Sequence, residues 1–395
     1  MLQSIQMKNL LSYGVDSEPI PLRPLNLIIG PNGSGKSNLL EGIALLQSAP
    51  SQLVAPIREG GGIHDWLWKG TKPPVTASLE IVVKLPANQH AIPLRYRIDF
   101  TASGNRFEII DERIENAEKL EGHSEPYFYY RYENNRPVLN IKATPNSKTA
   151  KKRYLQREDV DPEKSILAQR RDPDIYPEIT NLADTLAKIR IYRDWSLGRY
   201  TPPRLPQPSD LPNQWLEENA RNLGLVLNRL RRDHETKSRL LESFRVIYSE
   251  AEDFDVIIEA GTVQIFVQES RFNVPATRLS DGTLRYLCLL AILYDPAPPP
   301  LVCIDEPELG LHPDLIHSIA MALRFASSRT QVIVTTHSTA LVDAFTDDPE
   351  VVLVCEKRDG CSIVHRLDAQ RLQPWLEKYR LGSLWSSGEI GGNRW

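Results

Sequence analysis

The chain has few cysteines, and their spacing matches no disulfide or metal pattern. Only Cys288, Cys303, Cys355 and Cys361 occur in 395 residues, and no Cys-x-x-Cys pair is present. Small secreted domains depend on dense, paired cysteines, and zinc sites need closely spaced ligands. The pattern therefore excludes a disulfide framework and a zinc centre, and it favours reduced core thiols in a cytoplasmic protein.

Long hydrophobic runs and a strong charge excess are also missing. The longest apolar run, Tyr286–Tyr294, is far short of the ~20 residues that a membrane-spanning helix needs. No basic flank precedes an apolar stretch at the N-terminus, as it would in a secretory signal. Because 47 Lys and Arg face 51 Asp and Glu, the net charge is −4. We therefore expect no membrane association and no basic coat for nucleic acid, whereas a local basic patch stays open.

The sequence does contain enough apolar residues for a large core, since 41% are hydrophobic and 25% are charged. At ~150 residues per domain, the length predicts two or three modules. Residues 1–150 form a β-rich part that carries a glycine-rich loop, and residues 151–254 form a helical, proline-rich insertion. Residues 255–395 return to alternating strands and helices. Such alternation predicts an α/β fold with a mixed or parallel sheet whose ligand lies at the carboxyl ends of the strands.

Periodicity places elements within these parts. Apolar residues alternate over 77–85 and 94–100, which predicts antiparallel strands beside the glycine-rich loop. Within the insertion, Leu216, Ala220, Leu223, Leu227 and Leu230 follow helical spacing, so we expect one helix over 216–230. A second helix is expected over 240–248, and the two would form an antiparallel hairpin.

The glycine-rich segment Gly30–Ser37 fits the phosphate-binding pattern G-x-x-x-x-G-K-S, and it lies between an apolar strand and a helix. Glycines let the backbone N–H groups curl around phosphate oxygens, and the helix N-terminus adds positive partial charge. Lys36 would reach the β- and γ-phosphates of ATP, and the Ser37 hydroxyl would bind Mg²⁺. The alternative is a chance glycine turn. The predicted nucleotide-binding residues here are Asn32, Gly33, Ser34, Gly35, Lys36, Ser37 and Asn38.

Two further segments carry candidate catalytic groups. The apolar strand 301–304 ends in Asp305 and Glu306, where one carboxylate suits Mg²⁺ and the next can accept a proton from attacking water. His337 follows another apolar strand and can contact a γ-phosphate and orient the water. Taken alone, the acids could be a solvated pair, and the histidine could be structural.

A last segment, Leu279–Arg285, precedes a long apolar helix. Ser280, Asp281 and Gly282 then lie at a helix N-terminus, which is an anion-binding position. A simple helix cap would use the same residue types.

The four segments, taken in their order along the chain, resemble those of ABC-type ATPases of the RecF/SMC group. More narrowly, they resemble the short RecF-like ATPases without a long coiled coil. The resemblance covers Ser4 to about Val54 and Thr277 to Trp395. It implies an ABC-type ATPase head with an antiparallel β arm and a helical insertion. It further implies that 279–283 is the signature motif, that 306–313 is the D-loop region, and that His337 is the switch histidine.

The resemblance also implies ATP and Mg²⁺ as ligands and a head-to-head homodimer, or a higher oligomer, in which the signature of one copy closes over the ATP of the other. Two positions depart from a transporter-type signature, namely Asp281 in place of glycine and Thr283 in place of glutamine. No Q-loop glutamine stands out, and Gln47, Gln52 and His64 are weak candidates.

Two outputs are compatible with this resemblance. The first is a DNA-dependent ATPase clamp in DNA repair or anti-phage defence, and the second is an ATP-gated scaffold that holds and releases a separate effector, such as a TOPRIM-type nuclease. The DNA hypothesis draws on seven basic residues between Arg221 and Arg245, which could bind a phosphate backbone or could be a solvated helix face.

Overall fold

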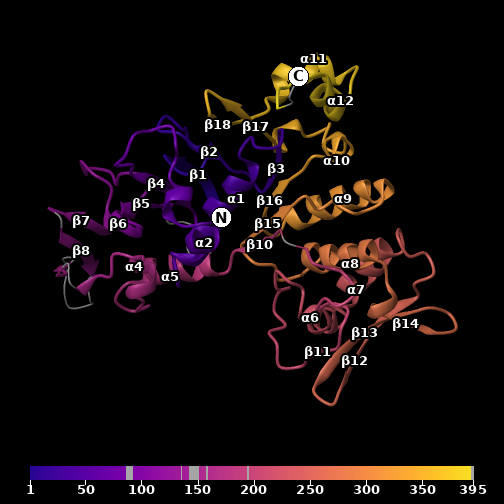
Figure 1. The fold of residues 1–395 in the computed structure, drawn as a ribbon. Helices are drawn as coiled ribbons and strands as arrows, with labels where there is room; N and C mark the ends of the chain where they lie inside the picture. Colours follow the sequence, from indigo (N-terminus) through magenta and orange to yellow (C-terminus); the bar gives the residue numbers. More distant parts are fainter. Residues whose placement is uncertain (86–91, 135, 142–150, 157–158, 194, 393–395) are drawn as a thin grey trace.

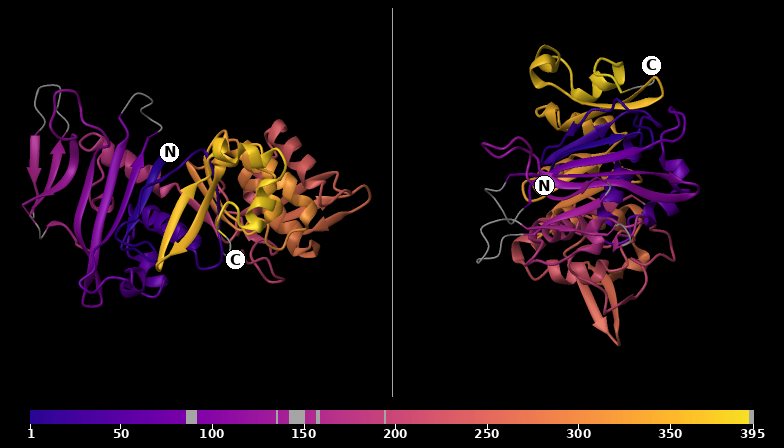
Figure 2. Two further views of the ribbon diagram at one scale, coloured as in Figure 1. Left: turned by 90° about the horizontal axis from the view of Figure 1, so that it is seen from above. Right: turned by 90° about the vertical axis from the view of Figure 1, so that its left-hand side faces the viewer.

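The computed structural model describes residues 1–85, 92–134, 136–141, 151–156, 159–193 and 195–392. Its strands form three sheets. An antiparallel arm sheet lies at one end of the molecule, a mostly parallel head sheet lies in the middle, and a small sheet lies with the insertion helices at the other end (Figures 1 and 2). The protein is therefore α/β, as predicted.

The head sheet has the strand order β10-β15-β16-β3-β17-β18. Its first five strands are mutually parallel, and β18 closes the edge by pairing with β17 in the antiparallel sense. These strands are β10 (Arg190–Tyr192), β15 (Leu301–Asp305), β16 (Gln331–Thr335), β3 (Leu25–Ile29), β17 (Val352–Arg358) and β18 (Cys361–Arg366).

Helices cover both faces of this sheet, which explains why its central strands are continuously apolar. Successive strand residues enter two different cores: Leu27, Val302 and Val334 pack with helices α8 (Asp281–Leu293) and α9 (Ile316–Ser327). Ile28 and Cys303 pack on the other side with helix α1 (Lys36–Ser48). Helices α1 and α8 therefore lie on opposite faces of the head sheet.

The arm sheet is antiparallel in the order β2-β1-β4-β5-β6-β7-β8-β9. It consists of β2 (Ile20–Pro21), β1 (Leu2–Lys8), β4 (Ala77–Val83), β5 (Leu94–Ser103), β6 (Arg106–Asn116), β7 (Phe128–Glu133), β8 (Arg136–Ile141) and β9 (Lys151–Tyr154). Tyr96, Ile98 and Ile114 point into the core that includes α1. The alternation over 77–85 and 94–100 thus corresponds to β4 and β5.

The insertion contributes to all three sheets. Its first strand, β9, completes the arm, and β10 forms the edge of the head sheet. The small sheet contains β11 (Gln207–Pro208), β12 (Asp253–Glu259), β13 (Thr262–Gln268) and β14 (Asn273–Pro275). The domain boundaries stay predictions: the boundary at residue 150 lies outside the described residues, and the boundary at 254 falls within β12.

The predicted helix over 216–230 is wrong in its first half. Helix α6 spans Leu223–Leu230, and α7 (His234–Phe244) follows it. Ala220 has a left-handed backbone (φ +55°), which no α-helix tolerates. The buried Asn222 side chain holds this turn, because it donates to Pro212 O at 2.7 Å and Trp215 O at 2.8 Å. Leu216 and Ala220 lie in this turn, outside any helix, and are buried in the same core as α6 and α8.

The other α-helices of the described residues are shorter than α1, α8 and α9. They are α2 (Ala55–Glu59), α3 (Ile63–Trp66), α4 (Ile166–Gln169), α5 (Pro177–Ala187), α10 (Thr339–Asp343), α11 (Ala369–Leu376) and α12 (Leu381–Ser387). Helix α5 packs beside α1.

Candidate nucleotide-binding site

The glycine-rich loop joins β3 to α1 at the carboxyl edge of the head sheet. Gly30, Gly33 and Gly35 all have positive φ angles, of 149°, 78° and 114°. Two of these glycines also pack closely against other segments of the same chain. A Cβ on Gly30 would lie 2.1 Å from Cys355 O, and one on Gly35 would lie 2.1 Å from the Ser362 hydroxyl. The loop can therefore seat on the β17–β18 hairpin only with glycine at these two positions.

Residues far away in the sequence hold the loop in this shape. The hydroxyl of Ser362 and the thiol of Cys355 both donate to Ser34 O. From the N-terminal segment, Tyr13 Oη donates to Gly35 O at 3.1 Å, and Ser12 Oγ accepts from Asn38 Nδ2 at 2.7 Å. Sequence reasoning missed these supports, because nothing local marks a serine or tyrosine that packs against a distant loop.

Lys36 is buried at the mouth of the loop. Its Nζ donates to Gly30 O at 2.8 Å and to Pro31 O at 3.1 Å, so the ammonium group lies across the loop. Burial lowers the pKa of Lys36, while the nearby charges of Glu306 and Asp305 act in the opposite direction.

The other predicted loop residues divide by exposure. Asn32, Gly33 and Ser37 are exposed, whereas Ser34 and Gly35 are buried. Within the described part of the chain, the Ser34 hydroxyl is buried without a hydrogen-bond partner. A buried, unpaired donor is costly, and an anion in the loop would satisfy it. The donor set therefore fits a bound phosphate.

The acidic pair and the histidine come together at the same edge of the sheet. Asp305, at the end of β15, accepts a hydrogen bond from the Thr335 hydroxyl on β16. Glu306 has a left-handed backbone (φ +45°), and its N–H donates to Thr335 O at 3.1 Å. His337 Nε2 lies 3.5 Å from Glu306 Oε1.

The surroundings of His337 favour the neutral form of its imidazole. Burial lowers its pKa from the ordinary 6.5, the Lys36 charge lowers it further, and nearby carboxylates oppose the shift. At pH 7 the contact between His337 and Glu306 therefore joins a mostly neutral imidazole to a carboxylate and is not a full ion pair.

Glu308 is a site residue to which the sequence assigned no role. One of its oxygens, Oε1, accepts from the Thr336 hydroxyl at 2.5 Å and from His337 N at 3.0 Å. This carboxylate fixes the segment that carries His337. The sequence placed Glu308 in the D-loop region without indicating that it would hold the histidine loop.

The signature segment caps helix α8. Ser280 Oγ accepts from Thr283 N at 3.0 Å, and Asp281 pairs with Arg204. The buried Arg204 guanidinium also donates to Leu197 O at 2.7 Å. A Cβ on Gly282 would lie 3.1 Å from Gly310 O, so the signature lies against the D-loop.

Ser280 and Asp281 are exposed to solvent. No contact described for these residues joins them to the phosphate loop of the same chain, in keeping with the opposite placement of α1 and α8.

Arg285 connects the signature helix to the acidic edge. This buried side chain extends from α8 and donates through Nη2 to Glu306 O at 2.9 Å. Its guanidinium carbon lies 5.4 Å from the centre of the Trp195 ring. A movement of α8 would therefore reach the backbone of Glu306 directly.

The Q-loop candidates are engaged elsewhere. Gln47 Nε2 donates to Ile189 O at 2.8 Å, and His64 Nε2 lies 3.0 Å from Gly104 O. Gln52 is exposed in the segment after α1. None of the three is brought to the phosphate loop in the described contacts.

Comparisons with known proteins identify the family and the fold of the chain. A family model described as "AAA domain, putative AbiEii toxin, Type IV TA system" matches residues 25–343. The chain belongs to this AAA-domain family. The Old nuclease of Escherichia phage P2 is 32% identical over 121 residues, which are 27% of this chain and 20% of that protein. The match thus spans only about a fifth of that relative's length.

Solved structures show the same fold for this AAA-domain protein. An Smc head domain from Pyrococcus furiosus, bound to the C-terminal domain of ScpA, aligns with a TM-score of 0.58 at 15% identity, over 95% of this chain and 98% of that one. An SmcHead bound to the C-winged helix domain of ScpA aligns with a TM-score of 0.57 at 16% identity, over 94% of this chain and 99% of that one. The fold class and the predicted resemblance are thereby confirmed: this AAA-domain protein has the fold of an Smc head.

The basic helices of this AAA-domain protein do not present a free positive face. Six of the seven basic residues between 221 and 245 are engaged within the chain. The pairs include Arg229 with Asp295, Arg231 with Asp255, and Lys237 with Asp253. These contacts weaken the DNA-binding interpretation of the helices.

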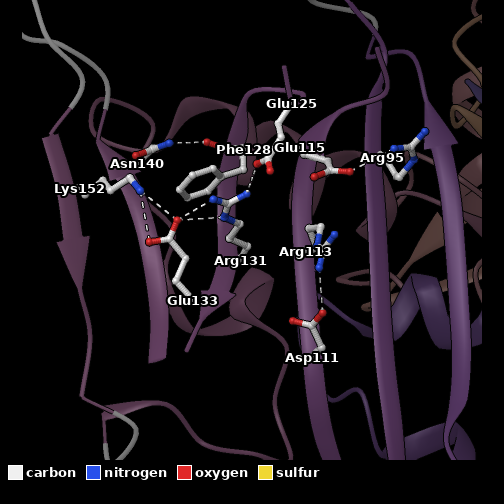
Figure 3. A network of polar contacts seen from close by, with 10 residues as sticks. All are labelled: Arg95, Asp111, Arg113, Glu115, Glu125, Phe128, Arg131, Glu133, Asn140 and Lys152. Carbon is white, nitrogen blue, oxygen red and sulfur yellow. Dashed lines mark hydrogen bonds and ion pairs between the residues drawn. The ribbon is translucent and has the colours of Figure 1, made fainter. Parts of the chain in front are cut away.

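The face of the arm sheet that points away from the core carries a network of ion pairs (Figure 3). Arg131 lies over the Phe128 ring at 4.0 Å and contacts Glu133 at 2.7 Å. Lys152 reaches the same carboxylate of Glu133 at 2.9 Å. Arg95 pairs with Glu115 at 3.1 Å and Arg113 with Asp111 at 3.3 Å, so basic and acidic groups alternate across this face.

The described residues contain neither a candidate membrane span nor a cluster of metal-binding side chains. No helix in that part of the chain has the length and apolar character to cross a membrane. No group of three or more His, Cys, Asp or Glu side chains is arranged to hold a metal ion there.

Proposed function

We propose that this protein is a Mg²⁺-dependent ATPase whose two copies close head to head around ATP. The observation that carries the proposal is that Lys36, Asp305, Glu306 and His337 converge at one edge of the head sheet, whereas no described contact joins the exposed Ser280 and Asp281 to the phosphate loop of the same chain. In one copy, the phosphate loop and its catalytic acids have no anion-binding helix N-terminus facing them. In a pair of copies, the signature helix of the partner can supply it.

Each residue has a role in this proposal. Lys36 and the loop N–H groups bind the β- and γ-phosphates. Ser37 and Asp305 would hold Mg²⁺, which neutralises phosphate charge when bound. Glu306 accepts the proton of the attacking water, and the neutral His337 donates a hydrogen bond that orients this water or the γ-phosphate.

The partner copy supplies the remaining donors. Ser280 and the N–H groups near Gly282 start an α-helix, where the backbone carries positive partial charge. We propose that this segment of one copy contacts the γ-phosphate held by the other. Closure then depends on ATP, because ADP lacks the group that both copies would bind.

A cavity of about 320 Å³ beside the loop is the proposed place for the nucleoside. Its lining includes Tyr13, Trp68, Cys361 and Val364. Tyr13 also bonds to Gly35 O, so the cavity shares a wall with the phosphate loop. Aromatic and aliphatic walls suit the faces of a base.

Mixing two inactive variants tests the composite site. Lys36→Ala removes the phosphate lysine, and Ser280→Arg blocks the signature. Each variant alone should be inactive, and an equimolar mixture should regain ATPase activity, because a mixed dimer contains one site with both halves intact. A mixture as inactive as its folded components would show that the signature does not act across copies.

For the biological role of ATP hydrolysis, we propose that the protein is an ATP-gated scaffold for a separate effector, in preference to a DNA-dependent clamp. The internal ion pairs of α6, α7 and the arm leave little free positive charge on these surfaces for a phosphate backbone. The Old nuclease match is consistent with a nuclease as the effector. DNA that raises the ATPase rate, with binding that falls steeply as salt increases, would instead favour the clamp.

A further inference from the structure

Arg193 follows strand β10 directly, and the register of the sheet places it beside the acidic edge. Strand β10 pairs with β15 in parallel, with Tyr192 opposite Ile304. The next residues along the two strands are therefore Arg193 and Asp305. Neighbouring strands are ~4.8 Å apart, so these two residues are adjacent at the carboxyl end of the sheet.

Both residues face helix α1. Ile191 and Cys303 belong to the core that contains α1, whereas Tyr192 and Ile304 belong to the core on the other face. Since strand side chains alternate between faces, Arg193 and Asp305 share the face of Ile191 and Cys303. Asp305 therefore has Thr335 on one side, as its hydrogen bond shows, and Arg193 on the other.

The guanidinium of Arg193 is held by helix α1. Its Nη1 lies 2.5 Å from Glu41 Oε1, and the two side chains are 28% and 30% exposed. Glu41 lies five residues after Lys36, so it is ~7.5 Å along the helix from the phosphate lysine. Helical side chains tilt toward the N-terminus, which brings this pair nearer to the loop.

The pair with Glu41 is suited to exchange. Partly exposed ion pairs contribute little to stability, so little is lost when one opens. A guanidinium has five N–H donors in a planar fork that matches phosphate oxygens, and the Glu41 contact uses one nitrogen.

We propose that Arg193 is a nucleotide-contacting residue that leaves Glu41 for the γ-phosphate of bound ATP, an inference that rests on the proposed function. The γ-phosphate is the expected target, because Arg193 adjoins the acidic edge, where the terminal phosphate and the attacking water are placed. Glu41 holds the side chain near the site when no triphosphate is present. The contact distinguishes ATP from ADP.

The test compares the dissociation constants of ATP and ADP, each with Mg²⁺, for the full chain and for matched variants. Arg193→Gln should weaken ATP binding ~10-fold or more, as expected for a lost charge-assisted hydrogen bond. The dissociation constant of ADP should change less than twofold. Glu41→Gln removes the same ion pair and keeps the arginine, so its preference for ATP should equal or exceed that of the wild type. A purely structural pair predicts equal effects from both variants.

Three results overturn the proposal: equal weakening of ATP and ADP by Arg193→Gln, no effect of this variant on either ligand, or an equal loss of ATP preference in Glu41→Gln. Should Arg193→Gln not fold, Arg193→Lys keeps the charge and loses the fork, and an unchanged ATP preference would overturn the proposal. Lys36→Ala should lose both nucleotides. If the wild type itself binds neither nucleotide, the proposed function fails, which is a different outcome from a failure of Arg193 alone.

Discussion

Two glycines of the phosphate loop make a matched pair of substitutions. Gly33 and Gly35 both have positive φ, but a Cβ at Gly33 meets nothing within 4 Å. A Cβ at Gly35 would lie 2.1 Å from Ser362 Oγ and 2.8 Å from Ser12 Oγ. Alanine at the first position tests backbone strain alone, and alanine at the second adds a collision.

The expected magnitudes follow from these two effects. A left-handed conformation costs a non-glycine residue ~1–2 kcal/mol, and alanine recovers ~0.4–1 kcal/mol through the unfolded chain. Gly33→Ala should therefore lower the free energy of unfolding by about 1 kcal/mol. Overpacking adds ~1–3 kcal/mol, so Gly35→Ala should cost roughly 2–4 kcal/mol.

Urea denaturation without nucleotide measures both variants, and a nucleotide titration then reports whether the loop still binds. Because the closer of the two collisions is with Ser362, the double variant Gly35→Ala with Ser362→Gly should recover part of the lost stability. Equal destabilisation by the two single variants, or no recovery in the double variant, would refute the packing of the loop on the β17–β18 hairpin.

Three further predictions concern single groups. Because burial and Lys36 lower the pKa of His337 from 6.5, turnover should stay high at pH 7 and fall only as the pH drops through that lowered pKa; an unchanged acid limb in His337→Asn would contradict this. Cys361 is partly exposed and lines the cavity proposed for the nucleoside, whereas the other three cysteines are buried. One thiol should therefore react quickly with a maleimide, and ATP should slow this reaction. Labelling unaffected by ATP would contradict the placement of the nucleoside in the cavity. Glu112 on β6 is buried and accepts hydrogen bonds from Tyr96 Oη at 2.9 Å and Ile166 N at 2.8 Å. Burial raises its pKa from 4.5 to about 7, so its contribution to stability is complete below pH 4.5 and is lost as the pH rises through 7. Glu112→Gln should flatten this part of the stability profile, and an unaltered profile would contradict the raised pKa.

The local parts of the site could be predicted from sequence. The strand over 25–29, the loop and the helix that follows are contiguous, so their glycines, lysine and apolar spacing are visible together. The same holds for Asp305 and Glu306 at the end of an apolar run. In each case, the chemistry and the element that positions it lie within about ten residues of one another.

The supporting residues could not be predicted, because they depend on contacts across the chain. Ser12 and Ser362 meet at the phosphate loop from opposite ends of the sequence. Arg193 acquires its place only through the pairing of β10 with β15. The helix expected over 216–230 failed for a related reason, since the turn at Ala220 is held by a buried asparagine whose partners the apolar spacing cannot reveal.

The central claim is that ATP joins two copies of this chain, and light scattering of Glu306→Gln measures this most directly. With ATP and Mg²⁺, the variant should bind nucleotide without turning it over, and its mass should become about twice the 44.8 kDa of the single chain. With ADP the mass should stay lower. A mass that is the same with ATP, with ADP and without nucleotide would contradict the account.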